Sequence, residues 1–457
     1  MALKKEDRIT ELRHKARRLS IKEGCFASIK TSLGDSYITP FAIAINTNNF
    51  IIALFTSLTG ILGPISQWFS SRLIEKYPRK KIFLTATLYE ALTWIPLILI
   101  TFLFYKGILT SLLPILLLLF FSIYIIIVNI TSPAWFSWIG DLVDEDYRGK
   151  WFSKRNFILG FISLFFTIFA AFFLDFFKKQ GWVMFGFMTL FFLAMFARLI
   201  SRECFKKAYE PKLKLKKDYY FSFWQFIKKA PSNNFGRFTI FRAALNFSAV
   251  LASPFFAVYM LKTLGFSYAL FMIVTLSQIF FGLLSLKRWG KLADKYGNYQ
   301  VLKLTILFIG LYPIFWMLSV SPIFLILVPA LIGGICWAGF DLATSNFIYD
   351  SVTPQKRGIC LSYYNLLNGI GIFLGAGIGG ILITFVSLKF MSTILFIFLI
   401  SGIARLASGF ILLPYIKEIR KTEKFNSKRA IENLIPKGIR LPVFEGTYEL
   451  MIKKEFK

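Results

Sequence analysis

The sequence predicts an all-α protein that crosses a membrane many times. Three observations predict it: the composition, the length of the apolar blocks and the placement of the basic residues. Of the 457 residues, 56% are hydrophobic and 17% are charged, whereas a soluble domain has about 45–50% apolar and about 25% charged residues. The apolar residues form long blocks, such as Ile82–Phe104, and not the short alternating segments of an outer-membrane barrel. This pattern excludes a soluble domain, a disordered chain and a disulfide-stabilised scaffold, and it favours a polytopic helical bundle.

Twelve apolar segments are long enough to be membrane spans, because about 20 helical residues cross a hydrocarbon core about 30 Å thick. We expect these spans at 24–46, 48–70, 82–104, 108–132, 157–177, 181–201, 236–260, 266–287, 300–320, 323–347, 360–387 and 390–415. Each segment is apolar along most of its length, so the prediction is of twelve membrane-crossing helices.

The basic residues lie almost entirely on one side of these spans. The termini and the loops on their side hold 46 of the 54 Lys and Arg residues, and the opposite loops hold five. Because Lys and Arg accumulate in cytoplasmic loops, we expect both termini in the cytoplasm and the chain in the cell membrane. The same placement accounts for most of the net charge of +30. We therefore expect the lipid bilayer as a partner and no nucleic acid.

The sequence contains no sign of a cofactor, a metal site or an enzyme. Its four cysteines are scattered without C-x-x-C spacing, and its single histidine, His14, lies in the polar N-terminus. It has no phosphate-binding loop of the G-x-x-x-x-G-K-[ST] type, so a built-in ATP motor is unsupported. The polar N-terminus, with no small-residue cleavage site, also predicts that there is no cleavable signal peptide.

Three blocks of the sequence occur twice, in the same order. The block G-x-F-x3-[KR]-x2-L begins at Gly24 and again at Gly236. The polar stretch 71–80, after span two, returns as 290–299 after span eight, and the block D-x6-R-G-x3-S-x2-N-x3-G begins at Asp141 and again at Asp350. The three blocks are displaced along the chain by nearly the same distance. This agreement predicts two parallel six-helix repeats, related by an axis along the membrane normal, with a substrate site between them.

The repeat divides the chain into five parts. We expect a basic cytoplasmic segment at 1–23, a six-helix bundle at 24–201, a cytoplasmic linker at 202–235, a second bundle at 236–415 and a basic cytoplasmic tail at 416–457. Apolar residues recur at helical spacing in the first segment. It is either an interfacial helix or a charged lead-in to span one.

The sequence resembles the major facilitator superfamily over nearly its whole length. The stretch Gly290-Lys-Leu-Ala-Asp294-Lys295-Tyr-Gly297 is similar to the family signature G-x-L-A-D-R-x-G. The first-half copy departs from it at Ser71, Glu75 and Pro78. The resemblance implies the twelve-helix fold of these transporters, and we expect a monomer. It also implies that Glu75 and Asp294 latch the cytoplasmic side shut in the outward-open state.

The candidate gate lies in the loops of the cytoplasmic side. Its residues are Glu75, Lys76, Arg79, Asp141, Arg148, Gly290, Asp294, Lys295, Gly297, Asp350 and Arg357. Asp141 with Arg148, and Asp350 with Arg357, resemble further parts of the latch. Charge-assisted hydrogen bonds of this kind form or break as helix ends move. The alternative is that these charges only anchor the loops and set the topology.

Polar residues inside spans are the candidate ligands of a substrate or a proton, because burying them in a membrane is costly. They are Lys30, Asp35, Glu90, Asn156, Arg242, Asn246, Asp341 and Asn365. Asn156 and Asn365 are repeat-related, and each could bond a substrate or join two helices. Asp341 is expected in the inner half of span ten.

The charged candidates differ in what they can reach. Lys30 and Asp35 are separated by about 140° around a helix, so we expect no shared face and an acidic partner for Lys30 elsewhere, or a substrate anion. Asp35 is near the midplane and too short to reach water, which favours a substrate ligand or a proton carrier. Arg242 is the repeat equivalent of Lys30. Both either face the cavity or reach back to the interface.

The remaining charges in spans are expected to have structural roles. Glu90 is predicted to pair with a neighbouring helix, because span three is generally peripheral to the cavity in the family that the sequence resembles. Arg198 and Arg405 are predicted to extend to the interface.

The sequence favours a secondary transporter for a small organic solute that works by alternating access. A proton gradient or a solute gradient would supply the energy. The alternative from another class is a non-transporting membrane receptor or interaction protein on the same scaffold, with the basic tail 416–457 docking a partner. Substrate-dependent flux distinguishes the two.

Overall fold

The computed structural model describes residues 2–211, 222–353, 356–420 and 422–423, without the side chains of residues 2–7, 71, 145–150 and 357. The N half consists of α1 (Ala2–Leu33), η1 (Asp35–Tyr37), α2 (Ile38–Ala44), α3 (Asn49–Lys76), α4 (Arg79–Leu92), α5 (Trp94–Tyr105), α6 (Leu113–Leu142), α7 (Glu145–Lys179) and α8 (Val183–Lys206). The C half consists of α9 (Phe223–Lys229), η2 (Ala230–Ser232), α10 (Asn234–Val250), α11 (Ser253–Val258), η3 (Tyr259–Thr263), α12 (Tyr268–Tyr296), α13 (Asn298–Phe315), α14 (Pro322–Leu325), η4 (Ile326–Ala330), α15 (Leu331–Ser351), α16 (Arg357–Phe385), α17 (Thr393–Leu412) and η5 (Leu413–Tyr415).

The predicted all-α fold with twelve spans in two six-helix repeats is confirmed. Eleven helical segments of the described chain are long and apolar enough to cross a membrane. The predicted first span, 24–46, is formed by the end of α1 together with η1 and α2. Its charged residues and its break keep it from being one long apolar helix. No strand occurs in the described part of the chain.

Span one is interrupted in the middle by Gly34. A Cβ atom at this position would overlap the Trp94 ring, so only glycine permits the close approach of span three. α1 ends at Leu33, and the chain turns through η1 before α2 begins. The prediction that Lys30 and Asp35 point to different faces of one helix is wrong, because the helix does not continue between them.

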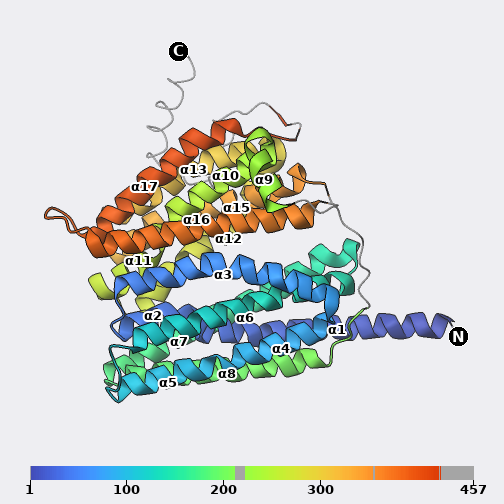
Figure 1. Ribbon diagram of the computed structural model, residues 1–457, viewed down its shortest axis with the longest axis horizontal. Helices are drawn as coiled ribbons and strands as arrows, with labels where there is room; N and C mark the ends of the chain where they lie inside the picture. The colour runs from blue at the N-terminus through green and yellow to red at the C-terminus, as the bar shows by residue number, and fades with distance from the viewer. Residues whose placement is uncertain (1, 212–221, 354–355, 421, 424–457) are drawn as a thin grey trace, which may run out of the picture.

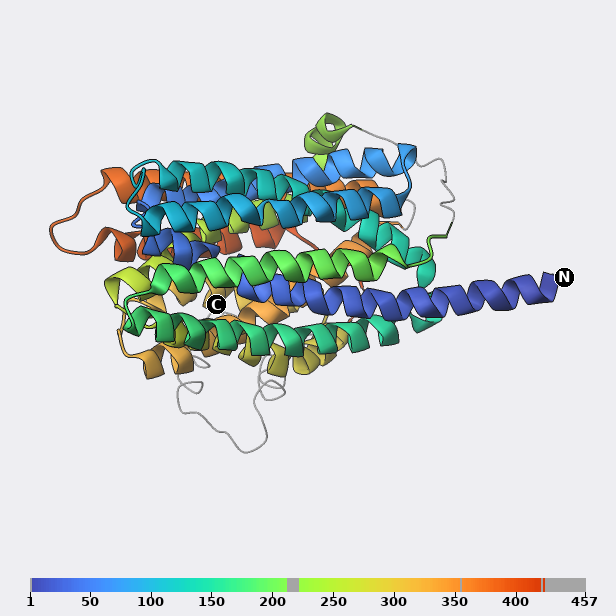
Figure 2. The ribbon, with the colours of Figure 1, turned by 90° about the horizontal axis from the view of Figure 1, so that it is seen from below.

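The N-terminal segment is a lead-in to span one. α1 begins at Ala2 and continues into the bundle without a break, and Figure 2 shows its first turns projecting past the other helices. Where α1 reaches the bundle, Arg13 and Arg17 lie 3.1 and 3.4 Å from the carboxylate of Asp144, which directly precedes α7. The described residues before span one therefore form no separate interfacial helix.

The helices run between two ends of the bundle, and Figure 1 shows the C half above the N half. We call the end near the N-terminus, where α3 meets α4 and α12 meets α13, the basic end. The opposite end, where α7 meets α8, is the far end. At the far end one apolar core contains residues of both halves, such as Phe41, Phe187, Phe255 and Tyr268. At the basic end each half has its own core, around Trp138 in the N half and in a separate cluster in the C half.

The two halves approach most closely along α3 and α16, which lie side by side in Figure 1. A Cβ atom on Gly369 would overlap the carbonyl oxygen of Gly60, so the two backbones touch there. Ser57 donates a hydrogen bond of 2.8 Å to the Phe373 carbonyl across the same contact. Another face of α16, at Gly371, Gly375 and Gly379, packs on α10 and the residue that follows it within the C half. Small residues therefore place α16 between both halves.

Candidate functional site

Lys30 lies at the centre of a buried polar cluster in the N half. Its Nζ atom is 3.0 Å from Asp35 Oδ2 and 2.9 Å from Glu90 Oε1. It also donates a hydrogen bond of 2.9 Å to the Tyr124 hydroxyl, which in turn donates to Asp35. Lys30 therefore does not extend to the interface, and its acidic partners are both within the half. Asp35 is 29% exposed, so it is the member of the cluster that a solute or water can reach.

The cluster continues toward the basic end as a chain of alternating charges. Glu90 lies 2.7 Å from Arg198, and Arg198 lies 3.4 Å from Glu23. Glu23 lies 3.6 Å from Arg155 on α7. Together with Lys30 and Asp35 this gives six charges in alternation. The prediction that Arg198 extends to the interface is wrong, because two buried carboxylates hold it inside the bundle.

The chain of charges is electrically balanced, with three acids and three bases. Balance of this kind is what permits ionised groups to stay inside a membrane protein, since each group loses its hydration. A cavity of about 220 Å³ lies beside its inner part, lined by Glu23, Arg155 and Arg198 among others. A proton that binds Asp35 would neutralise one of the two carboxylates that contact Lys30. Because Lys30 also contacts Glu90, this change of charge would act on Glu90 as well.

The C half has fewer charges at the equivalent depth. Arg242 lies 3.1 Å from Asp341, an exposed acid of α15, and its guanidinium is 4.9 Å from the centre of the Phe340 ring. Asn246 donates a hydrogen bond of 2.7 Å to Asn368 on α16. Arg242 is therefore held by a partner on a neighbouring helix and does not extend to the interface.

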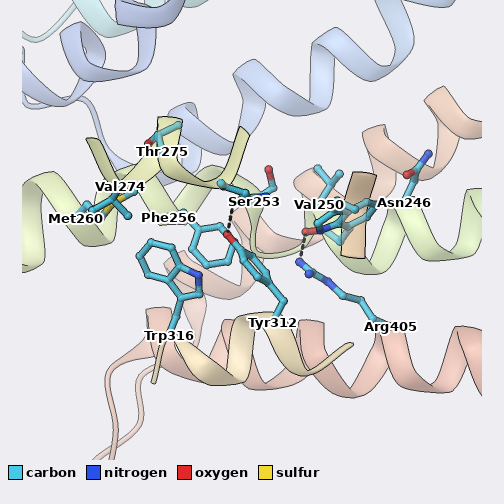
Figure 3. Close-up of a pocket in the computed structure, with 13 residues that line it drawn as sticks. Asn246, Val250, Ser253, Phe256, Met260, Val274, Thr275, Tyr312, Trp316 and Arg405 are labelled. Atoms are coloured by element: carbon cyan, nitrogen blue, oxygen red, sulfur yellow. Dashed lines mark hydrogen bonds between the residues drawn. The ribbon is translucent and has the colours of Figure 1, made fainter. Parts of the chain in front are cut away.

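A second cavity, of about 360 Å³, lies inside the C half between α10–α11, α12, α13, α15 and α17. Figure 3 shows Arg405, Tyr312 and Trp316 projecting into the region below Asn246 and Phe256. The Tyr312 hydroxyl donates a hydrogen bond of 3.0 Å to Gln278.

Arg405 lies in the wall of this second cavity and is 2% exposed. It donates hydrogen bonds to the carbonyl oxygens of Ala249 and Ile309, at 3.1 and 3.2 Å. The prediction that Arg405 extends to the interface is wrong, because these carbonyls hold it inside the half.

The two remaining polar candidates are less buried. Asn156 is exposed near the start of α7, and its repeat equivalent Asn365 is half-buried on α16. The described residues contain no group of three or more His, Cys, Asp or Glu side chains that could hold a metal ion.

At the basic end the N half carries a cluster around Arg79. This arginine is 1% exposed and lies 2.6 Å from Asp141. It also donates hydrogen bonds to the carbonyl oxygens of Ser137 and Pro211, at 2.9 and 2.7 Å, and lies 3.5 Å from Glu210. All of these partners belong to the N half or to the segment that follows α8.

The C half carries the matching cluster around Asp350, the repeat equivalent of Asp141. Asn298 stands in the second copy where Arg79 stands in the first, and it donates a hydrogen bond of 2.9 Å to Asp350. The missing arginine comes from the start of the tail: Arg420 lies 2.7 Å from Asp350 and 3.6 Å from Asp294. The hydrogen bond to Asp350 raises the pKa of Arg420, so this cation stays charged at every physiological pH.

The start of the tail is also fixed by a glycine. Gly297 has a φ of 92°, the left-handed region that favours glycine. The carboxylate of Glu418 occupies the place where its side chain would be, and accepts a hydrogen bond of 2.8 Å from the backbone of Tyr299. Lys295 lies 3.5 Å from Glu423, so several of the predicted gate residues contact the tail.

The other predicted gate residues are not joined into one cluster by the described contacts. Glu75 and Lys76 are exposed at the end of α3, and Gly290 has open space around the position of a Cβ atom. The side chains of Arg148 and Arg357 lie outside the described residues, so their predicted pairs with Asp141 and Asp350 lie outside them as well.

At the far end a carboxylate joins the two halves directly. Both oxygens of Asp175, on α7, accept hydrogen bonds of 2.8 Å from the backbone amides of Tyr268 and Ala269 at the start of α12. A carboxylate at a helix N-terminus satisfies unpaired N–H groups and is favoured by the helix dipole. The Tyr268 ring also packs edge-on against Phe187 of the N half, with ring centres 5.7 Å apart.

Several residues of these clusters are absent from the sequence-based candidates. Nothing in the spacing of Asp175 or Tyr124 marks them out. Arg420 lies in a tail that the sequence shows only as basic. Glu23 belongs to the predicted polar lead-in, although its place directly before the repeated glycine, Gly24, is a signal that it faces the bundle.

Comparisons with known proteins agree on the fold. The sequence pattern of the Major Facilitator Superfamily matches residues 24–322 and 238–445. No curated protein sequence matches the chain.

Solved structures are similar at low sequence identity. The nucleoside transporter NupG is 16% identical, with a TM-score of 0.61 over 88% of this chain and 98% of that one. A bacterial homologue of the iron transporter ferroportin, in an inward-facing state, is 16% identical, with a TM-score of 0.63 over 89% of this chain and 98% of that one.

Proposed function

The chain belongs to the major facilitator superfamily, and from this premise we propose that it moves a small organic solute across the cytoplasmic membrane by alternating access. Membership makes it a multi-pass membrane transporter rather than an enzyme, with a small-molecule substrate and the lipid bilayer as partners. In the proposed cycle the two halves rock about a site between them, so that each end of the bundle opens in turn.

The distribution of contacts between the halves is the observation that supports this proposal. At the far end Asp175 caps α12, and one apolar core contains residues of both halves. At the basic end the two cores are separate. A bundle that is closed at one end and divided at the other corresponds to one of the two states that alternating access requires. If the termini lie in the cytoplasm, as we propose, this state opens inward.

The polar clusters of the basic end support the proposed latch. Arg79 with Asp141, and Arg420 with Asp350, are pairs within one half. Asp294 is 77% exposed and only 3.6 Å from Arg420. In the opposite state, where the basic end closes, we propose that Glu75 and Asp294 pair with residues of the other half. Each new charge-assisted bond would then stabilise the outward-open state.

We propose Asp35 as the proton carrier if the transport is coupled to protons. It is the partly exposed end of the chain of charges, and it contacts both Lys30 and Tyr124. Protonation would release Lys30 from one of its two carboxylates. The charge of the buried cluster would then differ between the loaded and the empty carrier, which is what coupling requires.

The solved structures do not identify the substrate of this chain. Nucleosides and iron are named only for those proteins, and their sequence identity to this chain is low. The substrate is therefore a matter for flux measurements. The purified protein is reconstituted into liposomes, and uptake of a panel of organic solutes is followed with and without a pH gradient. Saturable uptake above that of protein-free liposomes supports the proposal. Absence of uptake for the whole panel, with a partner bound through the basic tail, would favour the receptor alternative.

A further inference from the structure

A fourth repeated block relates two buried arginines of the bundle. The sequence A-R-L-x-S occurs at Ala197–Ser201 in span six and again at Ala404–Ser408 in span twelve. Arg198 and Arg405 therefore occupy equivalent places in the two halves. Both are almost fully buried. Since an arginine stays ionised in proteins, each brings a positive charge into the interior of its half.

The two halves neutralise this charge differently. In the N half Arg198 lies against Glu90 and Glu23, at 2.7 and 3.4 Å. When the repeated blocks are aligned, Ile309 and Phe235 of the C half stand at the positions of these two glutamates. Both of these side chains are buried and apolar. The C half therefore has the arginine without its two carboxylates.

The surroundings of Arg405 leave its charge uncompensated. Its hydrogen bonds go to two backbone carbonyl oxygens, those of Ala249 and Ile309. Its Nε atom has no hydrogen-bond partner, and no carboxylate of the described chain forms an ion pair with it. A buried cation without a counter-charge is costly, and an anion that enters its site gains what the protein does not supply.

A cavity of suitable size lies at this arginine. Its volume is about 360 Å³, within the range of pockets that hold small organic ligands. Arg405 and the side-chain amide of Gln278 provide hydrogen-bond donors, and Phe256, Trp316 and Trp337 provide flat apolar surfaces. Figure 3 shows the Tyr312 ring between the Trp316 ring and the Arg405 side chain.

We propose that this cavity binds a small organic anion whose carboxylate pairs with Arg405 and whose flat apolar part packs against the aromatic side chains. The carboxylate takes the place that Glu90 and Glu23 occupy in the N half. The inference goes beyond the proposed function, because the cavity lies within the C half and not between the halves, and it assigns a small organic anion as a ligand of this transporter.

Arg405 also has a structural role that the test must separate from ligand binding. Its bonds to the carbonyls of Ala249 and Ile309 tie α17 to α10 and α13. Loss of the guanidinium could therefore loosen the C half without any relation to a ligand. The Ile309→Glu variant avoids this difficulty, because it keeps Arg405 and adds the carboxylate that the N half has at the equivalent position.

Benzoate is the probe, with benzamide as its neutral counterpart of nearly equal shape. Binding to the purified full-length protein is measured by calorimetry and by quenching of tryptophan fluorescence. We expect benzoate to bind and benzamide to bind at least about thirtyfold more weakly, because truncating one partner of a buried charged pair has effects of this size. The proposal would be overturned if benzoate and benzamide bind equally tightly. It would also be overturned if chloride competes for the site as strongly as benzoate binds to it.

Three variants assign the binding to Arg405. Arg405→Gln is expected to lose benzoate binding, and Arg405→Lys to keep part of it, because the lysine retains the charge but not the fork of donors. Ile309→Glu is expected to lose benzoate binding while its melting temperature does not fall. Arg288→Gln is the matched control, since this arginine lies near the basic end of α12, away from the cavity. It should bind benzoate like the parent protein.

The outcomes separate this inference from the proposed function. If Ile309→Glu is folded and binds benzoate as tightly as the parent protein, the carboxylate site at Arg405 is wrong, whatever the flux experiments give. If benzoate binds at Arg405 but no solute of the panel is carried across the liposome membrane, the site stands and the transport function fails.

Discussion

Lys30 and Asp35 form an ion pair of 3.0 Å across the break in span one. The pair exists because α1 ends at Leu33 and the chain turns through η1, which brings the carboxylate back toward the ammonium. Since Lys30 also contacts Glu90 at 2.9 Å, the break connects the partly exposed Asp35 to the buried chain of charges. The break at Gly34 thus allows Lys30 and Asp35 to pair in the proposed carrier site.

Gly34→Ala tests the importance of this break. A Cβ atom would overlap the Trp94 ring at the start of α5, so the ring and its surroundings have to shift. We expect a loss of about 1–3 kcal/mol of stability, as for other overpacked cores, measured as a lower melting temperature in detergent. Gly160→Ala is the control, because the Cβ atom there meets nothing within 4 Å. Equal melting temperatures for the two variants would contradict the role assigned to Gly34.

The fold could be predicted from the sequence because it depends on patterns that are long and repeated. Apolar blocks of span length, the one-sided placement of the basic residues and the duplicated blocks each point to the same bundle. Span one could not be predicted in detail. A helix that breaks at Gly34 and one that continues have the same apolar pattern, and the Trp94 ring that requires the glycine belongs to a different span.

Glu90→Gln tests whether the chain of charges holds the N half together. The substitution removes the carboxylate that lies between Lys30 and Arg198, and leaves two buried cations with reduced compensation. Breaking a buried ion pair by removing one partner costs about 3–5 kcal/mol, so the melting temperature should fall clearly.

The control for that experiment is Glu203→Gln. Glu203 pairs with Arg202 and Lys206 on the surface of α8, and an exposed pair contributes about 0–1 kcal/mol. If both variants melt at the parent temperature, the buried chain of charges does not stabilise the fold.

Asp35→Asn separates transport from proton coupling. The amide cannot carry a proton but keeps a similar shape, so we expect exchange of a transported solute between the two sides of the liposome to continue. Acceleration by a pH gradient should be lost. The measurement is solute uptake together with the proton flux reported by a pH-sensitive dye inside the liposomes. A variant that still moves protons with the solute would exclude Asp35 as the carrier.

Asp175→Ala tests the contact that closes the far end. Losing a helix cap costs about 1 kcal/mol, which changes an equilibrium between two states about fivefold. Spin labels at Lys179→Cys and Lys262→Cys, one on each half, report the width of this end, and we expect a larger population of long distances.

Ser392→Ala is the matched control, because Ser392 caps α17 at the same end but within one half. The spin labels in this variant should give the same distance distribution as in the parent protein. If the two cap variants behave alike, Asp175 does not hold the halves together.

Asp294→Asn tests the proposed latch. In this structure Asp294 contributes little to stability, because it is exposed and lies 3.6 Å from Arg420. If it latches the basic end in the opposite state, its neutralisation should enrich the state described here, seen as shorter far-end distances. Asp144→Asn is the control at the same end, since Asp144 is held within the N half by Arg13 and Arg17. An unchanged balance of states in Asp294→Asn would contradict the latch.

The candidate site could be predicted only in part. Charged residues in spans are conspicuous in the sequence, which is why Lys30, Asp35 and Glu90 are candidates, and the expected partner of Glu90 on a neighbouring helix is present. The predictions for Arg198 and Arg405 are wrong, because a long side chain that extends to water and one that is buried look alike in a sequence. Only the positions of the helices show which carbonyls and carboxylates lie near.

The most direct test of alternating access measures both ends of the bundle in one experiment. Spin labels are placed at Lys81→Cys and Lys291→Cys for the basic end, and at Lys179→Cys and Lys262→Cys for the far end. Both pairs are placed in a background whose four native cysteines are replaced by alanine. In lipid nanodiscs we predict two populations, in which a wide basic end goes with a narrow far end and the reverse, and a transported solute shifts their ratio. The account would be contradicted if each end shows a single distance and no solute changes either distance.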